Sequence, residues 1–217
     1  MTRAADAPSA AALVDDALSL ADWRRRIFEL YRDARKAPDP AAARSRWRAA
    51  RDELFAGHPQ SPLPAGEREG FTGLEYFDYD PSARVLATIE PLEPATLEIA
   101  TSGEEPFRFT RFGTAGFELG GEALALELYW LEGYGGGLYV PFADATSGHE
   151  TYGAGRYVLD TIKGADLGVD DDRLVLDFNF SYNPSCAYDP RWVCPLAPPA
   201  NRLAVAVRAG ERTDPAP

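Results

Sequence analysis

Two segments of the sequence concentrate side chains that could bind a ligand or transfer a proton. The first, D-A-T-S-G-H-E-T-Y-G-A-G-R-Y from Asp144 to Tyr157, contains three glycines among polar residues. Such glycines allow close backbone approach and can point consecutive N–H groups at a ligand. Arg156 could hold a carboxylate or a phosphate in bidentate fashion. The segment therefore predicts an anion-binding loop, with Asp144, Glu150, Tyr152 and Arg156 as its polar side chains.

The second segment is D-F-N-F-S-Y-N-P-S-C-A-Y, from Asp177 to Tyr188. If its first five residues are extended, Asp177, Asn179 and Ser181 share one face, and Phe178 and Phe180 pack on the other. A polar face of this kind is exposed to solvent, satisfied internally or part of a pocket. The residue types leave a structural network and a ligand pocket equally open.

Several kinds of chemistry can be weighed on these residues. Cys186 could act as a nucleophile with His58 as its base and Asp177 or Asn179 as the orienting group. Cys186 could equally be a small buried residue or half of a disulfide with Cys194. We expect no metal site, because the two cysteines lack C-x₂₋₄-C spacing and H-E-x-x-H is absent. Without a dinucleotide motif or a P-loop, the cofactor remains unknown.

The candidate site residues follow from these patterns. As catalytic groups we predict His58, Glu150, Asp177 and Cys186, and as ligand-binding groups Asp144, Tyr152, Arg156, Asn179, Tyr182 and Asn183.

The composition changes near residue 57, because all 19 glycines lie from Gly57 onward. Before that point, apolar residues between Leu20 and Tyr31 recur at three- and four-residue intervals, which predicts a helix. Asp39 as N-cap and Pro40 at the first helical position predict a second helix that ends at Gly57. The arginines outside these apolar stripes are interpreted as a solvated face.

From Phe71 the pattern changes to short apolar runs separated by turn residues, which is typical of strands. This predicts an α+β fold, mainly antiparallel, with a barrel or sandwich-like meander and the N-terminal pair of helices packed on it. We expect a flexible N-terminus over 1–10, helices over 11–57, a β-rich main domain over 58–208 and a flexible tail over 209–217. The predicted strands are Val85–Ile89, Leu97–Thr101, Phe107–Phe112, Phe117–Leu119, Leu124–Trp130, Leu138–Phe142, Leu174–Phe178 and the segment L-A-V-A-V after Asn201.

Charge limits the classes of partner. The chain of 217 residues has 34 acidic and 22 basic side chains, a net charge of −12. Negative charge repels phosphate backbones and anionic lipid, so we expect neither nucleic-acid nor membrane-surface binding. A signal-peptide pattern and a bilayer-length apolar run are both missing from the sequence, which favours a cytoplasmic location. The sequence leaves the oligomeric state open.

Five blocks of the sequence resemble a bacterial and archaeal family of unknown function, DUF1684. The resemblance runs from about Trp23 to Glu211 and implies that the polar blocks form one unit in a single domain, without implying an activity. We therefore predict a pocket for a small polar or anionic ligand, and the sequence leaves open whether the pocket is that of an enzyme. The alternative is a structural or protein-interaction domain whose polar blocks lock loops together. The blocks are H-P-Q-S-P-L from His58, G-L-E-Y-F-D-Y-D-P from Gly73, L-Y-V-P-F-A-D-A-T-S-G-H-E-T-Y-G-A-G-R-Y from Leu138, D-F-N-F-S-Y-N-P-S-C-A-Y from Asp177 and C-P-L-A-P-P-A-N-R-L from Cys194.

Overall fold

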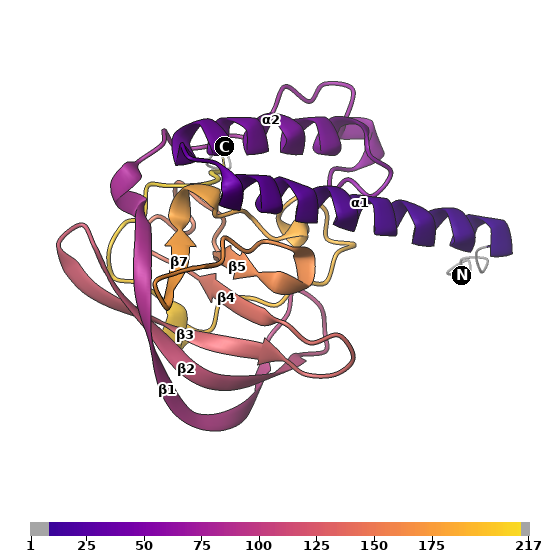
Figure 1. The fold of residues 1–217 in the computed structure, drawn as a ribbon. Coiled ribbons are helices and arrows are strands. Elements are labelled where there is room, and N and C mark those ends of the chain that lie inside the picture. Colours follow the sequence, from indigo (N-terminus) through magenta and orange to yellow (C-terminus); the bar gives the residue numbers. More distant parts are fainter. Residues whose placement is uncertain (1–8, 214–217) are drawn as a thin grey trace.

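Two helices pack against a curled antiparallel sheet in the computed structural model, which describes residues 9–213. Seven strands follow the order β5-β4-β3-β2-β1-β7-β6 and form a half-barrel. Figure 1 shows α1 and α2 side by side across one end of this half-barrel. The predicted α+β fold with an antiparallel meander is confirmed. Residues 1–8 of the predicted flexible segment 1–10 lie outside the described residues.

Local sequence signals explain where both helices begin. Helix α1 spans Ala10–Lys36, and the Ser9 side chain accepts a hydrogen bond from the Ala12 N–H at its start. Helix α2 spans Pro40–Gly57, and Asp39 accepts hydrogen bonds from the N–H groups of residues 41 and 42, as an N-cap does. The predicted start and end of α2 are confirmed.

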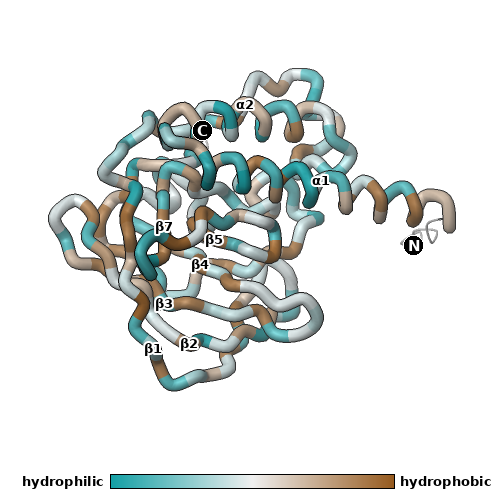
Figure 2. The backbone as a smooth tube through the Cα atoms, viewed as in Figure 1, coloured by the Kyte–Doolittle hydropathy of each residue, from teal (hydrophilic) through white to brown (hydrophobic). Residues whose placement is uncertain are grey.

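The N-terminal end of α1 extends past the sheet (Figure 1), where Leu13, Val14 and Leu18 are exposed. In Figure 2 hydrophobic and hydrophilic residues alternate along both helices, as expected of helices with one buried face. None of the helices within residues 9–213 combines the length and the apolar character needed to cross a bilayer.

Long strands replace some of the predicted short ones. Val85–Ile89 and most of Leu97–Thr101 belong to one strand, β1, because a shift in register between Pro91 and Ala95 accommodates the prolines. Phe107–Phe112 and Phe117–Leu119 are likewise both part of β2. The strands are β1 (Arg84–Ile99), β2 (Phe107–Leu119), β3 (Glu122–Leu131), β4 (Leu138–Phe142), β5 (Arg156–Asp160), β6 (Val169–Asp170) and β7 (Arg173–Asp177).

Three local predictions were wrong. Residues Phe178–Phe180 form a 3₁₀ turn, η4, because the Asp177 carboxylate caps the N–H of Asn179 and turns the chain. L-A-V-A-V after Asn201 forms no regular strand and runs alongside residues 143–145 through single hydrogen bonds. The tail expected from residue 209 begins instead with buried residues, since Ala209 and Glu211 are about 1% exposed.

Three groups of apolar side chains form the interior. The first fills the curled sheet and includes Leu126, Phe142 and Leu176. The second joins the two helices to the sheet around Trp47 and Phe180. The third is aromatic and consists of Ile99, Phe109, Tyr129, Tyr139 and Tyr157. The polar segments described above lie where the first and second groups meet.

Candidate functional site

Arg156, the predicted anion clamp, is the first residue of β5 and only 1% exposed. Its Nη2 donates to Asp144 Oδ2 at 2.8 Å and to the Val207 carbonyl at 2.8 Å. Its Nη1 donates to the carbonyls of Ala209 and Glu211 at 2.5 and 3.1 Å. These five residues form a closed cluster that fastens the C-terminal segment to the sheet. Arg156 and Asp144 therefore act on the protein's own backbone.

Asp177 and Asn179 form a second closed cluster at the end of β7. Asp177 Oδ1 accepts hydrogen bonds from the backbone N–H and the side-chain amide of Asn179, at 3.0 and 2.9 Å. The Asn179 amide also bonds both backbone groups of Asp80. Burial raises the pKa of Asp177, whose Oδ2 has no hydrogen-bond partner and lies 4.0 Å from Arg84 Nε. Asp177 and Asn179 therefore hold the loop at Asp80, just before β1, against the sheet.

Glu150 and His58 have separate surroundings. Glu150 accepts hydrogen bonds from Arg208, which hold the pKa of this carboxyl below its usual range. His58 Nδ1 accepts from the Gln60 N–H, so Nε2 carries the proton and faces Asp22 Oδ2 at 3.3 Å. Because neither side chain hydrogen-bonds Cys186, the predicted Cys–His arrangement is not formed.

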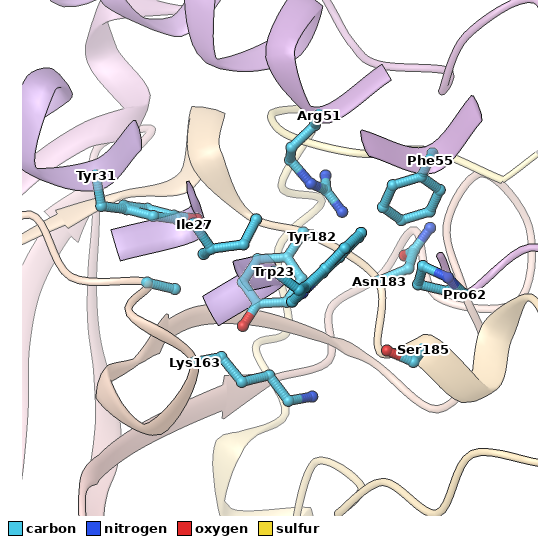
Figure 3. Close-up of a pocket in the computed structure, with 11 residues that line it drawn as sticks. Trp23, Ile27, Tyr31, Arg51, Phe55, Pro62, Lys163, Tyr182, Asn183 and Ser185 are labelled. Atoms are coloured by element: carbon cyan, nitrogen blue, oxygen red, sulfur yellow. The ribbon is translucent and has the colours of Figure 1, made fainter. Parts of the chain in front are cut away.

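Tyr182 and Asn183, two predicted ligand-binding residues, line a cavity of about 60 Å³ between α1, the end of α2 and the segment after η4 (Figure 3). Asn183 is 2% exposed, and its Oδ1 has no hydrogen-bond partner. Its amide nitrogen donates to Glu211 and to the Arg212 carbonyl. The cavity is also lined by Trp23, Ile27, Tyr31, Arg51, Phe55, Pro62, Lys163, Ala165 and Ser185.

Arg51 of α2 is a buried cation beside this cavity. Its Nη1 donates to Glu211 Oε2 at 2.9 Å and to the Tyr76 hydroxyl at 2.5 Å. Its guanidinium lies about 5 Å from the ring centroids of Trp47 and Phe55. Burial raises the pKa of Glu211, and Arg51 opposes that effect. The Arg51 charge is therefore already balanced by a carboxylate.

Lys163 enters the cavity from the opposite side, at the end of the 3₁₀ turn η3 (Thr161–Lys163) (Figure 3). Its amino group lies 5.6 Å from the centroid of the Tyr157 ring, and it forms no salt bridge within residues 9–213. Lys163 also lines a second, outer cavity of about 230 Å³ together with Trp23, Pro62 and Ser185. The two cavities share these four residues, so they adjoin.

Tyr152 and Cys186 meet at the edge of this region. The Tyr152 hydroxyl lies 3.8 Å from Cys186 Sγ. Cys186 and Cys194 are both free thiols, so the disulfide considered from the sequence is not formed. Within the described part of the chain, His, Cys, Asp and Glu side chains do not gather in a group of three that could hold a metal ion.

Three residues of the region were missed by sequence reasoning. Arg51 stands four residues after Trp47 and three before Leu54, so its position on the buried face of α2 was readable from the sequence. Lys163 is one of only two lysines, which is a weak indication of a functional role. Glu211 gave no local signal, because its role depends on partners from α2 and from residue 183.

The fold and its buried polar clusters define a class of small α+β proteins in which two N-terminal helices cover a curled antiparallel sheet. The chain belongs to the family described as "Protein of unknown function (DUF1684)", whose model matches residues 69–212. The match confirms the resemblance for the four blocks from Gly73 onward, whereas the block from His58 lies outside the matched residues. A solution NMR structure of an uncharacterized protein from Haloarcula marismortui is similar, with 40% sequence identity and a TM-score of 0.57. That match covers 78% of this chain and 91% of the archaeal chain. The comparison with curated proteins gave no match.

Proposed function

We propose that the protein binds a small carboxylate or phosphate compound in the two adjoining cavities beside Lys163. The observation that carries this proposal is an unpaired cation and an unpaired acceptor on residues that line the same cavity. Lys163 is half-buried and forms no salt bridge within residues 9–213, and the buried Asn183 Oδ1 lacks a hydrogen-bond donor. Buried polar atoms normally have partners, so Asn183 favours a ligand with a donor group, and the Lys163 charge favours one with an anionic group.

The cavity sizes support a small ligand with two parts. One water molecule needs about 10–15 Å³ of cavity volume measured in this way, so the inner cavity of about 60 Å³ fits a group of a few atoms. The outer cavity, about 230 Å³, leaves room for the remainder of the ligand. Trp23 contributes an aromatic wall to both cavities and serves as a fluorescent reporter.

Tyr182, Asn183, Lys163 and Ser185 are the binding residues of this proposal. Arg51 shapes the cavity through its fixed pair with Glu211. Arg156 has no role in ligand contact in this proposal, because its hydrogen bonds are made to the protein itself.

Thermal unfolding in the presence of acetate, succinate, benzoate or inorganic phosphate tests the proposal. A ligand present at 100 times its Kd stabilises the folded state by about 2.7 kcal/mol. We expect at least one probe to raise the Tm of the wild type, and the effect to disappear in Lys163→Met. Lys36→Met is the matched control, because Lys36 is the other lysine and is exposed at the end of α1. Equal responses of wild type and Lys163→Met, or no response to any probe, would refute it.

A second candidate function is a structural or interaction role in which the polar blocks lock loops together. It is favoured by the Arg156 cluster, where one buried side chain holds three backbone carbonyls and Asp144. The two candidates concern different residues, so unfolding experiments on Arg156 and binding experiments on Lys163 test them separately.

A further inference from the structure

A third cavity, of about 50 Å³, lies between the end of α1, the start of α2 and the point where β1 and β7 meet. It has no lining residue in common with the two cavities beside Lys163. Its charged residues are Arg35, Arg84 and Asp177, so a carboxylate and two guanidinium groups face one small space. The remaining lining residues are Ala34, Ala37, Pro40, Leu167 and Phe180.

The pairing of β1 with β7 places Arg84 directly opposite Asp177. Arg84 is the first residue of β1, Asp177 is the last residue of β7, and the two are partners in the antiparallel register. Residues in such positions are close enough to interact through their side chains. Yet Arg84 Nε lies 4.0 Å from Asp177 Oδ2, beyond the usual hydrogen-bond range of about 2.7–3.2 Å. The two charges therefore attract each other without a direct hydrogen bond.

The Asp177 carboxylate is held in place by its other oxygen. Oδ1 accepts both hydrogen bonds from Asn179, whose amide is fixed in turn by the backbone of Asp80. Oδ2 has no hydrogen-bond partner among residues 9–213, although the side chain is only 1% exposed. A buried acceptor without a donor is unfavourable, so Oδ2 favours a ligand group that donates a hydrogen bond.

The two arginines give the cavity its positive side. Both side chains are 33% exposed, so the cavity reaches the surface beside them, whereas Asp177 and Phe180 form its buried end. Arg35 Nη1 donates to the Asp166 carbonyl and lies 3.5 Å from the carboxylate of the same residue. In the part of the chain that the structure describes, Arg84 has no salt bridge besides its 4.0 Å contact with Asp177. Guanidinium groups with free N–H donors favour a carboxylate on the ligand.

We propose that this cavity binds a small hydroxy acid, whose hydroxyl group bridges Asp177 and Arg84 and whose carboxylate meets the two guanidinium groups. A hydroxyl oxygen can lie about 2.8 Å from both Oδ2 and Nε, donating to the first and accepting from the second. An ammonium group could only donate, and a carboxylate could only accept. At about 10–15 Å³ for one water molecule, the cavity suits a compound of the size of glycolate. This site is independent of the function proposed above, because it uses none of the same residues.

An NMR titration of the full chain with glycolate, acetate and glycine tests the proposal. Acetate lacks the hydroxyl group, and glycine has an ammonium group in its place. We expect glycolate to shift the backbone amides of Ala37 and Leu167 and to bind about tenfold or more tightly than the other two, because hydrogen bonds to charged groups are lost with them. Equal affinities for the three compounds, or no shift at these amides, would overturn the proposal. Glycolate shifts confined to the surroundings of Lys163 and Ser185 would also overturn it, while leaving the function proposed above intact.

Two substitutions assign the roles within the site. Asp177→Asn keeps an oxygen to cap Asn179 but replaces the acceptor at Oδ2, so the preference for glycolate over acetate should disappear. Arg84→Met should weaken the binding of both compounds about tenfold or more. Since Arg84 is at the edge of the fold and partly exposed, this variant carries the test even if Asp177→Asn does not fold.

Matched controls separate this site from general effects of charge. Arg173→Met changes an exposed arginine of the same strand as Asp177, and Lys163→Met changes the cation of the other cavities. Both control variants should bind glycolate as the wild type does. A glycolate preference that persists in Asp177→Asn, or equal weakening in Arg84→Met and Arg173→Met, would show that the site is assigned wrongly.

Discussion

Two of the arginine–carboxylate pairs have similar N···O distances but opposite environments. Arg156 and Asp144 have side chains 1% and 0% exposed, with 2.8 Å between Nη2 and Oδ2. Arg208 and Glu150 are 63% and 34% exposed, with 3.0 Å between Nη2 and Oε1. If one member of the first pair is removed, water cannot reach the other member to take its place. Water can solvate both members of the second pair.

Arg156→Ala should therefore destabilise the protein far more than Arg208→Ala. Removing Arg156 leaves Asp144 and three carbonyls without their donor, and breaking such a buried pair costs about 3–5 kcal/mol. Loss of the exposed pair should cost far less, because solvent screens both charges. Urea unfolding of the two variants measures the difference. Similar midpoints for both would show that the Arg156 cluster does not lock the fold, and would remove the support for the structural candidate function.

At this scale the sequence predicts which residues are unusual, but not what they bind. Asp144, Arg156, Asp177 and Asn179 were chosen for polarity in apolar surroundings, and all four are buried. Their partners include backbone carbonyls more than 50 residues away. Because every residue has such a carbonyl, the residue types do not indicate which one accepts the hydrogen bond. The sequence could therefore identify these polar groups, but it could not separate internal locks from ligand contacts.

Helix α2 owes its position to one side chain more than to its apolar pattern. Trp47 is 1% exposed and packs against Tyr31, Tyr76 and Phe180, which come from α1, the segment before the sheet and η4. These ring contacts connect three parts of the chain through a single indole.

Trp47→Ala should cost about 3–5 kcal/mol, the usual range for deleting a buried aromatic side chain. The matched variant is Trp130→Ala, because Trp130 is 47% exposed on β3 and its loss should cost well under this amount. Chemical unfolding monitored by circular dichroism compares them independently of the lost fluorescence. A Trp47→Ala protein as stable as Trp130→Ala would mean that α2 is held mainly by other contacts.

Elements with strong local signals were predictable. The cap at Asp39 and Pro40 defined α2, and alternating apolar runs located β2, β3 and β4. Strand β5 was missed, because its first residues, Arg156 and Tyr157, belong to the polar glycine-containing segment from which an anion-binding loop was predicted. Its burial comes from pairing with β4, which is a tertiary effect. The extended reading of residues 177–181 failed because a capping carboxylate at Asp177 outweighed the alternation.

At the scale of the whole molecule, Glu211 connects α2 to the C-terminal segment. Its carboxylate accepts from Arg51 and from the backbone and side chain of Asn183. Glu211 thus links α2, the cavity-lining Asn183 and the C-terminal segment through one buried carboxylate.

A double-mutant cycle measures this connection. Arg51→Met strands a buried carboxylate and should cost about 3–5 kcal/mol near neutral pH. Glu211→Gln removes the buried charge and keeps one side-chain oxygen as an acceptor for Asn183, so the double variant should recover part of that loss, with a coupling of about 0.5–3 kcal/mol. Strictly additive costs in urea unfolding would contradict the connection.

Acidification provides a second readout of the same cycle. Burial raises the folded-state pKa of Glu211 above its unfolded value, and loss of Arg51 removes an opposing effect. Between the two pKa values, the folded state keeps the proton that the unfolded state has already released. The free energy of unfolding therefore falls as the pH rises through this range. Arg51→Met should therefore lose more stability than wild type as the pH rises, and the double variant should not.

The pair of Arg51 and Glu211 also sets an order of events during synthesis. The two residues are 160 positions apart, so at about 5–20 residues per second the ribosome adds the partner roughly 10–30 s after Arg51. Until then the guanidinium has no carboxylate partner in that position and remains best solvated by water. The helices emerge first, yet the buried charge of α2 gains its partner only when Glu211 has been translated.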